Sequence, residues 1–322
     1  MYNKQRDLEF FSMVLAMIGL FIGIINYERD IREHKNPVNL KDYPNAMDHP
    51  RNSSPFVQVC RCIIVITTMI SIVILFLKQN YRKVWLNSYF SDKKKSDPSQ
   101  VELMHQEEEE DYIENEEDDD GADKDQDFGH GEHLITRQFL LEVAMLAIVP
   151  IPCYDRYIIM YCEGKDTIWF LSEFMLVIMF SRFYFLVKSM LNYTQFMDPY
   201  TKKVCKSYGF ENSVLFTIKS NIEINPEATV SYIFILTLFV FAYIIRIFEL
   251  PRFRLDGDDN FDSFFESIWL TVITLTTIGY GDVSPLTIPG KITTIILAFW
   301  GALIMALIVV VLYRVFDLSD DE

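Results

Sequence analysis

The chain has 322 residues, half of them apolar and 15% aromatic, with a formal net charge of −16. Several windows of about twenty residues are almost wholly apolar, which is long enough to cross a bilayer core of about 30 Å and excludes an ordinary soluble protein. The charge balance gives no basic patch for nucleic acid. The five cysteines are scattered without the spacing of metal ligands, and we expect no cofactor.

Six apolar runs are predicted to be membrane-spanning helices. Inside a bilayer the backbone has no water to bond, so each run must be helical. Acidic residues precede the first run and no small-residue cleavage site follows it, which favours a retained span over a signal peptide. The runs cover about Phe10–Tyr27, Phe56–Leu77, Ile135–Ile151, Thr167–Leu191, Val230–Glu249 and Ile288–Tyr313.

Loop charges predict the orientation of these runs. Lysine and arginine gather after the second run and after the fourth, and the positive-inside rule places both loops in the cytoplasm. The loop after the first run is also basic, but it carries about as many acids. We expect a multi-pass protein surrounded by membrane lipid, in the plasma membrane, with both termini cytoplasmic.

A strongly acidic segment lies between the second and third runs. Residues 107–127 hold fourteen acids and one base. Their self-repulsion and the shortage of apolar residues predict a disordered linker over about residues 89–133. Some acids fall near the spacing of an EF-hand, but the ligand types are wrong and amphipathic flanking helices are missing, so we expect no EF-hand.

The stretch between the fifth and last runs has a different pattern. Residues 261–274 (FDSFFESIWLTVIT) form an amphipathic helical pattern that is too short to span a bilayer. The glycine-bearing sequence TTIGYGD follows directly. A half-length helix with irregular backbone at membrane depth predicts a re-entrant loop around a water-filled path. Five acids precede the glycine-bearing sequence. They would either raise the cation concentration at the outer mouth of this path or belong to an ordinary solvated loop: Asp256, Asp258, Asp259, Asp262 and Glu266.

The sequence Thr277-Ile278-Gly279-Tyr280-Gly281 has the features of a potassium selectivity filter. Rings of backbone carbonyls can replace the hydration shell of potassium. Successive carbonyls point at one axis if the backbone alternates with left-handed conformations, which glycine adopts without penalty. The side chains of Ile278 and Tyr280 would then point away from the axis. We expect K⁺ as the permeant ion at Thr277, Ile278, Gly279 and Tyr280, and four chains to close each ring.

This motif resembles the signature of the potassium-channel superfamily, with isoleucine at the usual valine position. The order of span, short helix, filter and span agrees with it. In that superfamily the residues placed as Trp269 and Asp282 support the filter through hydrogen bonds. The other reading of Trp269 is packing against lipid.

Further segments resemble the small-conductance calcium-activated potassium channels over about residues 135–318. The resemblance implies calcium activation, and it implies calmodulin as a partner bound after the last span. The chain stops at DLSDDE without that binding segment. We therefore expect a truncated form, another route for calcium, or a constitutive or silent pore. The segments are PIPCY at 150–154, FSRFYFLVKSMLNYTQFMD at 180–198, FTIKSNIEINPEATV at 216–230 and ALIVVVLYRVFDL at 306–318.

The fourth and last runs carry the expectations about gating. A voltage sensor needs a basic residue at every third position, and the fourth run has only Arg182 and Lys188, which predicts weak voltage dependence. Candidates for the inner pore and gate are Gly301, Ala306, Val310 and Arg314. Gly301 could be a hinge or could allow close helix packing. A disulfide between Cys153 and Cys162 is a further hypothesis.

The fold class predicted is an all-α membrane protein of six transmembrane helices, with a re-entrant pore helix and selectivity filter between the fifth and sixth, assembled as a tetramer. The expected function is potassium-selective conduction with three further subunits, not enzymatic catalysis. The alternative is a non-conducting regulatory subunit that assembles with longer relatives. Predicted regions are 1–88 (first two spans), 89–133 (acidic linker), 134–198 (third and fourth spans), 199–227 (cytoplasmic linker) and 228–322 (pore domain).

Overall fold

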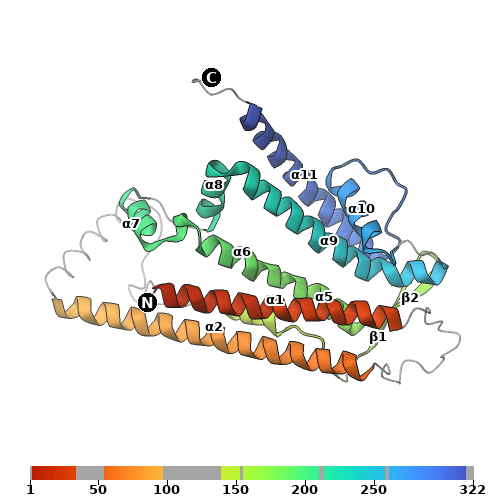
Figure 1. The fold of residues 1–322 in the computed structure, drawn as a ribbon, viewed down its shortest axis with the longest axis horizontal. Helices are drawn as coiled ribbons and strands as arrows, with labels where there is room; N and C mark the ends of the chain where they lie inside the picture. Colours follow the sequence, from red (N-terminus) through yellow and green to blue (C-terminus); the bar gives the residue numbers. More distant parts are fainter. Residues whose placement is uncertain are drawn as a thin grey trace, which may run out of the picture. The chain divides into compact units, whose positions relative to one another are not determined.

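The computed structural model describes residues 2–33, 54–96, 139–152, 155–209, 214–257 and 261–316. Helices dominate these ranges (Figure 1). Five of the described helices are long and apolar enough to cross a membrane, judged by length and composition: Lys4–Glu33, Pro55–Tyr81, Leu171–Asn192, Pro226–Asp256 and Ile288–Arg314. Five of the six predicted runs therefore correspond to long apolar helices.

The chain forms two compact units, and the first combines Met1–Ala16 with Thr67–Ala147. It contains the start of α1 (Tyr2–Glu33) and the later part of α2 (Pro55–Ser96). The hydroxyls of Ser12 and Ser71 lie 2.9 Å apart, and Lys78 forms an ion pair with Glu9. These polar contacts fix the pairing of two otherwise apolar helix faces.

The third predicted run is described only in part. Residues 139–147 are helical, residues 148–152 are not, and residues 135–138 lie outside the described ranges. Proline at 150 and 152 accounts for the end of the helix, because proline disfavours helical backbone at the residue before it. The acidic linker also lies outside the described residues.

The second unit, Met17–Ile66 with Ile148–Glu322, contains a β-hairpin that departs from the all-α expectation. Strands β1 (Tyr157–Cys162) and β2 (Lys165–Phe170) pair antiparallel. The two-residue turn has φ of 45° at Glu163 and 83° at Gly164, and positive φ at both positions is typical of a tight hairpin. The fourth run consequently begins its helix at Leu171, not at Thr167.

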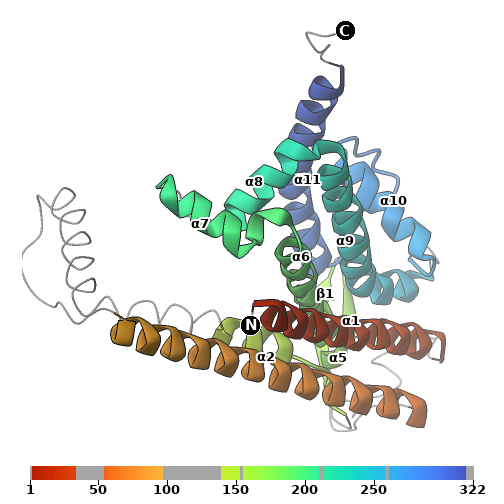
Figure 2. The ribbon, with the colours of Figure 1, turned by 60° about the vertical axis from the view of Figure 1, so that its left-hand side comes forward.

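The remaining elements of this unit lead from the hairpin to the re-entrant region. α5 (Leu171–Met179), the 3₁₀ turn η1 (Phe180–Arg182) and α6 (Phe183–Asn192) form the fourth run, and Arg182 is fully buried. The turn η2 (Gln195–Met197), α7 (Pro199–Ser207) and α8 (Val214–Ile224) follow. α9 (Pro226–Asp256), α10 (Phe264–Leu275) and α11 (Ile288–Phe316) then lie side by side (Figures 1 and 2).

Candidate functional site

The short helix α10 covers Phe264–Leu275, so it starts three residues later than the predicted pattern of 261–274 and ends one residue later. The Ser263 hydroxyl accepts a hydrogen bond from the backbone N–H of Phe265, which caps the first turn. At the other end the carbonyl of Ile273 accepts from the N–H groups of Ile278 (2.9 Å) and Gly279 (3.0 Å). These bonds fold the chain back at the end of the helix, whose carbonyls carry partial negative charge.

The backbone after α10 alternates in handedness. Thr277, Gly279 and Gly281 have φ of 60°, 58° and 77°. The intervening side chains, Ile278 and Tyr280, are 54% and 66% exposed in the single chain. The left-handed positions therefore recur at every second residue. Sequence reasoning included Thr277 in the filter but predicted left-handed backbone only at the two glycines, although the regular spacing of two also indicates it at Thr277.

Trp269 and Asp282 are brought together beside this loop. The indole Nε1 donates to a carboxylate oxygen of Asp282 at 2.7 Å. The indole ring also stacks on the Tyr280 ring, with centroids 5.9 Å apart and planes 9° apart. This hydrogen bond lowers the pKa of Asp282 below its usual range. The predicted pair thus tethers the end of the filter sequence to α10.

Sequence reasoning missed a buried carboxylate on α9. Glu249 is fully buried and accepts hydrogen bonds from the N–H groups of Leu286 (2.9 Å) and Thr287 (3.1 Å) and from the Thr287 hydroxyl (2.8 Å). It satisfies donors at the start of α11 that have no partner inside the helix. A Cβ on Gly290 would lie 1.8 Å from Glu249 Oε1, so a larger residue there would have to displace this carboxylate. An acid within an apolar run was the available signal.

The four candidates for the inner pore and gate all lie on α11. Gly301 is buried, and a Cβ there would lie 2.7 Å from the Leu275 carbonyl oxygen. This close approach supports packing as the reason for the glycine. Ala306, Val310 and Arg314 are exposed in the single chain, and Arg314 donates to Glu223 on α8 at 2.8 Å. Their role in a gate stays a prediction.

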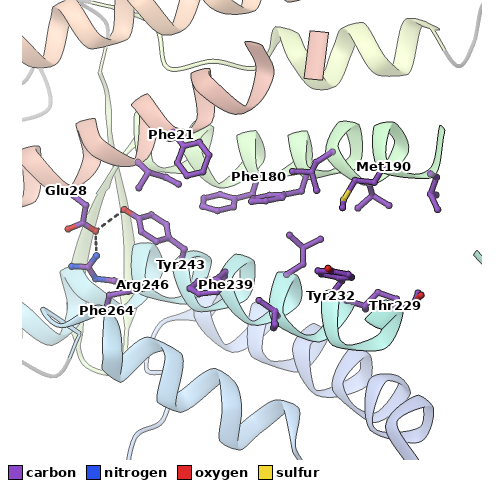
Figure 3. Close-up of a pocket in the computed structure, with 18 of the residues that line it drawn as sticks. Phe21, Glu28, Phe180, Met190, Thr229, Tyr232, Phe239, Tyr243, Arg246 and Phe264 are labelled. Carbon is purple, nitrogen blue, oxygen red and sulfur yellow. Dashed lines mark hydrogen bonds and ion pairs between the residues drawn. The ribbon is translucent and has the colours of Figure 1, made fainter. Parts of the chain in front are cut away.

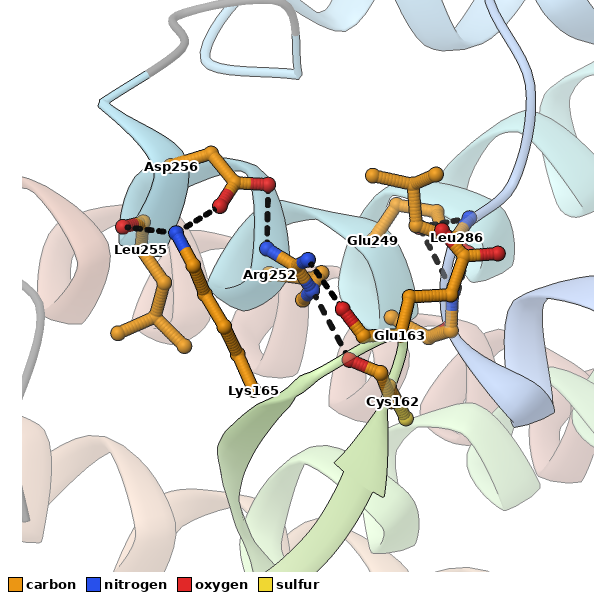
Figure 4. Close-up of polar contacts among 9 residues, drawn as sticks. Cys162, Glu163, Lys165, Glu249, Arg252, Leu255, Asp256 and Leu286 are labelled. Atoms are coloured by element: carbon orange, nitrogen blue, oxygen red, sulfur yellow. Dashed lines mark hydrogen bonds and ion pairs between the residues drawn. The ribbon is translucent and has the colours of Figure 1, made fainter.

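The hairpin turn is anchored to the end of α9 (Figure 4). The Arg252 guanidinium donates to the carbonyls of Cys162 and Glu163, both at 3.3 Å. Asp256 forms ion pairs with Arg252 and Lys165. The Cys162 thiol is buried and free, and its suggested partner Cys153 lies outside the described residues.

Two of the acids that precede the filter, for which the sequence leaves open a role in attracting cations, form ion pairs within the chain. Asp256 is matched by two cations, and Asp262 forms an ion pair with Arg254 at 2.6 Å. Asp258 and Asp259 lie outside the described residues. The two acids just named are therefore largely neutralised within their own chain.

Comparison with known proteins identifies the region that contains this site. A family model described as an ion channel matches residues 232–317. The chain is 31% identical over 146 residues to the small conductance calcium-activated potassium channel protein of Drosophila melanogaster, which covers 45% of this chain and 15% of that protein. It is also 37% identical over 95 residues to human potassium voltage-gated channel subfamily A member 6. That match covers 28% of this chain and 18% of that protein. The matches thus span less than a fifth of either relative.

The expected resemblance to potassium channels is confirmed by these matches. The matched proteins are channels and not enzymes, and with the long apolar helices they indicate a multi-pass membrane protein. Both relatives are named as channels, so the alternative of a regulatory subunit is not favoured.

Proposed function

We propose that this protein is a potassium-selective channel in which four chains surround one pore. The observation that carries the proposal is the alternation of left-handed backbone at Thr277, Gly279 and Gly281, directly after the short helix α10. Such alternation directs successive carbonyls to one side, where four copies could form the oxygen rings that replace potassium hydration. Trp269 and Asp282 would hold that geometry, and Glu249 would hold the start of the inner helix.

We propose further that voltage drives the channel weakly and that calcium opens it. The basis is the fourth run, which has Arg182 buried and a single further cation, together with the similarity to a calcium-activated relative. Calmodulin is a candidate calcium-binding partner, although its usual binding segment is absent from these 322 residues. The proposal about calcium is separate from the one about the filter.

Recording current from inside-out patches of cells that express the chain alone tests both proposals. We expect a reversal potential that follows the potassium gradient, a shallow dependence on voltage, and current that rises when internal calcium is stepped up with calmodulin present. Potassium current that is flat across calcium would contradict the calcium proposal alone. A current that follows the sodium gradient equally well would contradict the filter.

A further inference from the structure

A large apolar groove lies in the second unit, and the filter residues do not line it. Its volume is about 1360 Å³, and its lining residues come mainly from α1, α6, α8 and α9. Figure 3 shows Phe21 and Phe180 on one side and Tyr232 and Phe239 on the other. Nothing in conduction through the pore requires such a space.

Between its charged end and the uncharged polar residues at its other end, the apolar part of the groove has about the length of one bilayer leaflet. Its apolar lining runs from Phe180 to Leu191 along the fourth run and from Tyr232 to Tyr243 along α9, each about 16 Å of helix. Half of a hydrocarbon core of about 30 Å is about 15 Å. Both helices are long and apolar enough to cross a membrane, so the groove lies at the depth of acyl chains.

Charged residues gather at only one end of the groove. Glu28 accepts a hydrogen bond from the Tyr243 hydroxyl at 2.9 Å and forms an ion pair with Arg246 (Figure 3). At the same end Arg254 pairs with Asp262. At the other end the polar lining consists of uncharged side chains such as Asn221 and Thr229. A ligand that fits must therefore be charged at one end and apolar over the rest.

Arg32 decides the sign of the charge that the ligand should carry. It lines the charged end and is exposed, and no ion pair within the described ranges of the chain involves it. The two acids at this end are already matched by Arg246 and Arg254. An arginine without an acidic partner beside an apolar groove is suited to a phosphate, which it can bind with two parallel N–H donors.

We propose that the groove binds one phospholipid of the surrounding bilayer, with an acyl chain between α6 and α9 and its phosphate on Arg32. A helix from a second copy of the chain is the competing occupant. A membrane-crossing helix would extend over the full core of about 30 Å rather than one leaflet.

Photo-crosslinking in vesicles of phosphatidylcholine tests the position of the lipid's acyl chain. The probe is phosphatidylcholine with a diazirine at the end of one acyl chain, and labelled peptides are identified by mass spectrometry. We expect labels to concentrate on the groove faces of α6 and α9. Val187→Trp should fill the groove and reduce those labels about tenfold, because the displaced methylenes lose their burial.

The matched control is Val59→Trp, since Val59 is 56% exposed on α2 and does not line the groove. It should leave the labels on α6 and α9 unchanged. Each variant must elute like the unmodified protein in size-exclusion chromatography, and Leu236→Trp replaces Val187→Trp if the latter does not. Labels spread evenly over all apolar helices, or unchanged by the filling variant, would overturn the proposal.

Native mass spectrometry tests the head group. Arg32→Gln should weaken retention of phosphatidylcholine about tenfold, because a charge-assisted bond to phosphate is lost. Arg29→Gln is the control, since Arg29 lies on the same helix, pairs with Glu33 and does not line the groove. Equal retention by Arg32→Gln and the unmodified protein would overturn the proposal. Efficient cross-linking of the Leu236→Cys variant through that position to another copy of the chain would also overturn it.

Discussion

Thr277 adopts the same left-handed backbone as the two glycines that follow it at intervals of two. For a residue with a Cβ this conformation costs about 1–2 kcal/mol. Residues held in such strained conformations cluster at functional sites, where the surrounding structure imposes them. The strain at Thr277 therefore supports a functional geometry for the whole stretch, beyond what the glycines alone indicate.

Gly279→Ala should abolish potassium-selective current. Alanine disfavours φ of 58° by about 1–2 kcal/mol, and four subunits would each carry that cost. The measurement is the reversal potential with potassium on one side of the membrane and sodium on the other. Gly209→Ala is the control, because Gly209 has φ of 72° but lies far from the filter in the sequence. Normal selectivity in the Gly279 variant would contradict the assignment.

The hydrogen bond from Trp269 to Asp282 predicts a shift in the response to external acid. The bond lowers the pKa of Asp282, so its support for the filter is present above the ordinary pKa of aspartate and is lost only as pH falls through the lowered value. Trp269→Phe removes the donor and keeps an aromatic ring. The bond is then absent at every pH, so in recordings over a series of external pH values we expect its current to show no decline over the range in which the unmodified protein loses the bond.

Asp282→Asn separates this explanation from a general loss of packing. The variant has no carboxylate to titrate, so its current should not respond to pH in this range. Asp282→Asn keeps an acceptor oxygen for the indole N–H, so a double variant with Trp269→Phe should behave like Trp269→Phe alone. Identical pH responses of the unmodified channel and Trp269→Phe would show that the bond does not control Asp282.

At the scale of elements, Glu249 joins α9 to the start of α11. Glu249→Ala would leave buried donors on Leu286 and Thr287 without an acceptor, at a cost of about 3 kcal/mol. Glu249→Gln should cost less, because the amide keeps one acceptor oxygen. Thermal unfolding of the purified protein in detergent measures both. Glu223→Gln is the control, since that side chain is 69% exposed, and an unchanged melting temperature for Glu249→Ala would contradict the inferred role.

Gly301→Ala distinguishes packing from hinge motion in α11. A Cβ would lie 2.7 Å from the Leu275 carbonyl oxygen, so we expect a loss of about 1–3 kcal/mol from forced displacement of α10. Thermal unfolding measures this loss. Adding Ala302→Gly restores a flexible residue at the neighbouring exposed position. It should not restore function if packing is the cause, and recovery of normal gating in the double variant would favour the hinge.

The long helices were predictable from sequence because each is an apolar run bounded by charges or proline, and the membrane leaves such a run no alternative to helix. The hairpin was not, because YIIMYC and KDTIWF are short apolar and mixed stretches that resemble the start of a span. What fixes it as a hairpin is its anchoring by Arg252 and by Trp169, whose Nε1 donates to the Phe248 carbonyl at 3.1 Å. Both contacts join residues about 80 to 90 positions apart.

The residues of the candidate site also differ in how well the sequence predicts them. Gly279, Gly281 and the Trp269–Asp282 pair could be identified from a local motif with a fixed spacing. Glu249 could be noticed as an acid within an apolar run, but its partners lie 37 and 38 residues away along the chain. For Gly301 the sequence leaves packing and hinge motion both open, and the distance to Leu275 supports packing.

For the whole molecule, large aromatic side chains near the filter are exposed to solvent in the single chain. Tyr280, in the loop after α10, is 66% exposed, and Phe265, in the first turn of α10, is 69% exposed. Neighbouring subunits would cover these rings in a fourfold assembly. We expect chemical cross-linking of the protein in membranes to yield dimers, trimers and tetramers and no larger species. A ladder that ends at the dimer would contradict the fourfold arrangement.

The central claim is that backbone oxygens of four copies of residues 277–281 replace the hydration shell of potassium. Purified protein in a planar bilayer tests it most directly, with potassium chloride on one side and an equal concentration of sodium chloride on the other. We expect a reversal potential of the sign and size set by a large preference for potassium, in single-channel steps. A reversal potential near zero, with sodium carried as readily as potassium, would contradict the claim.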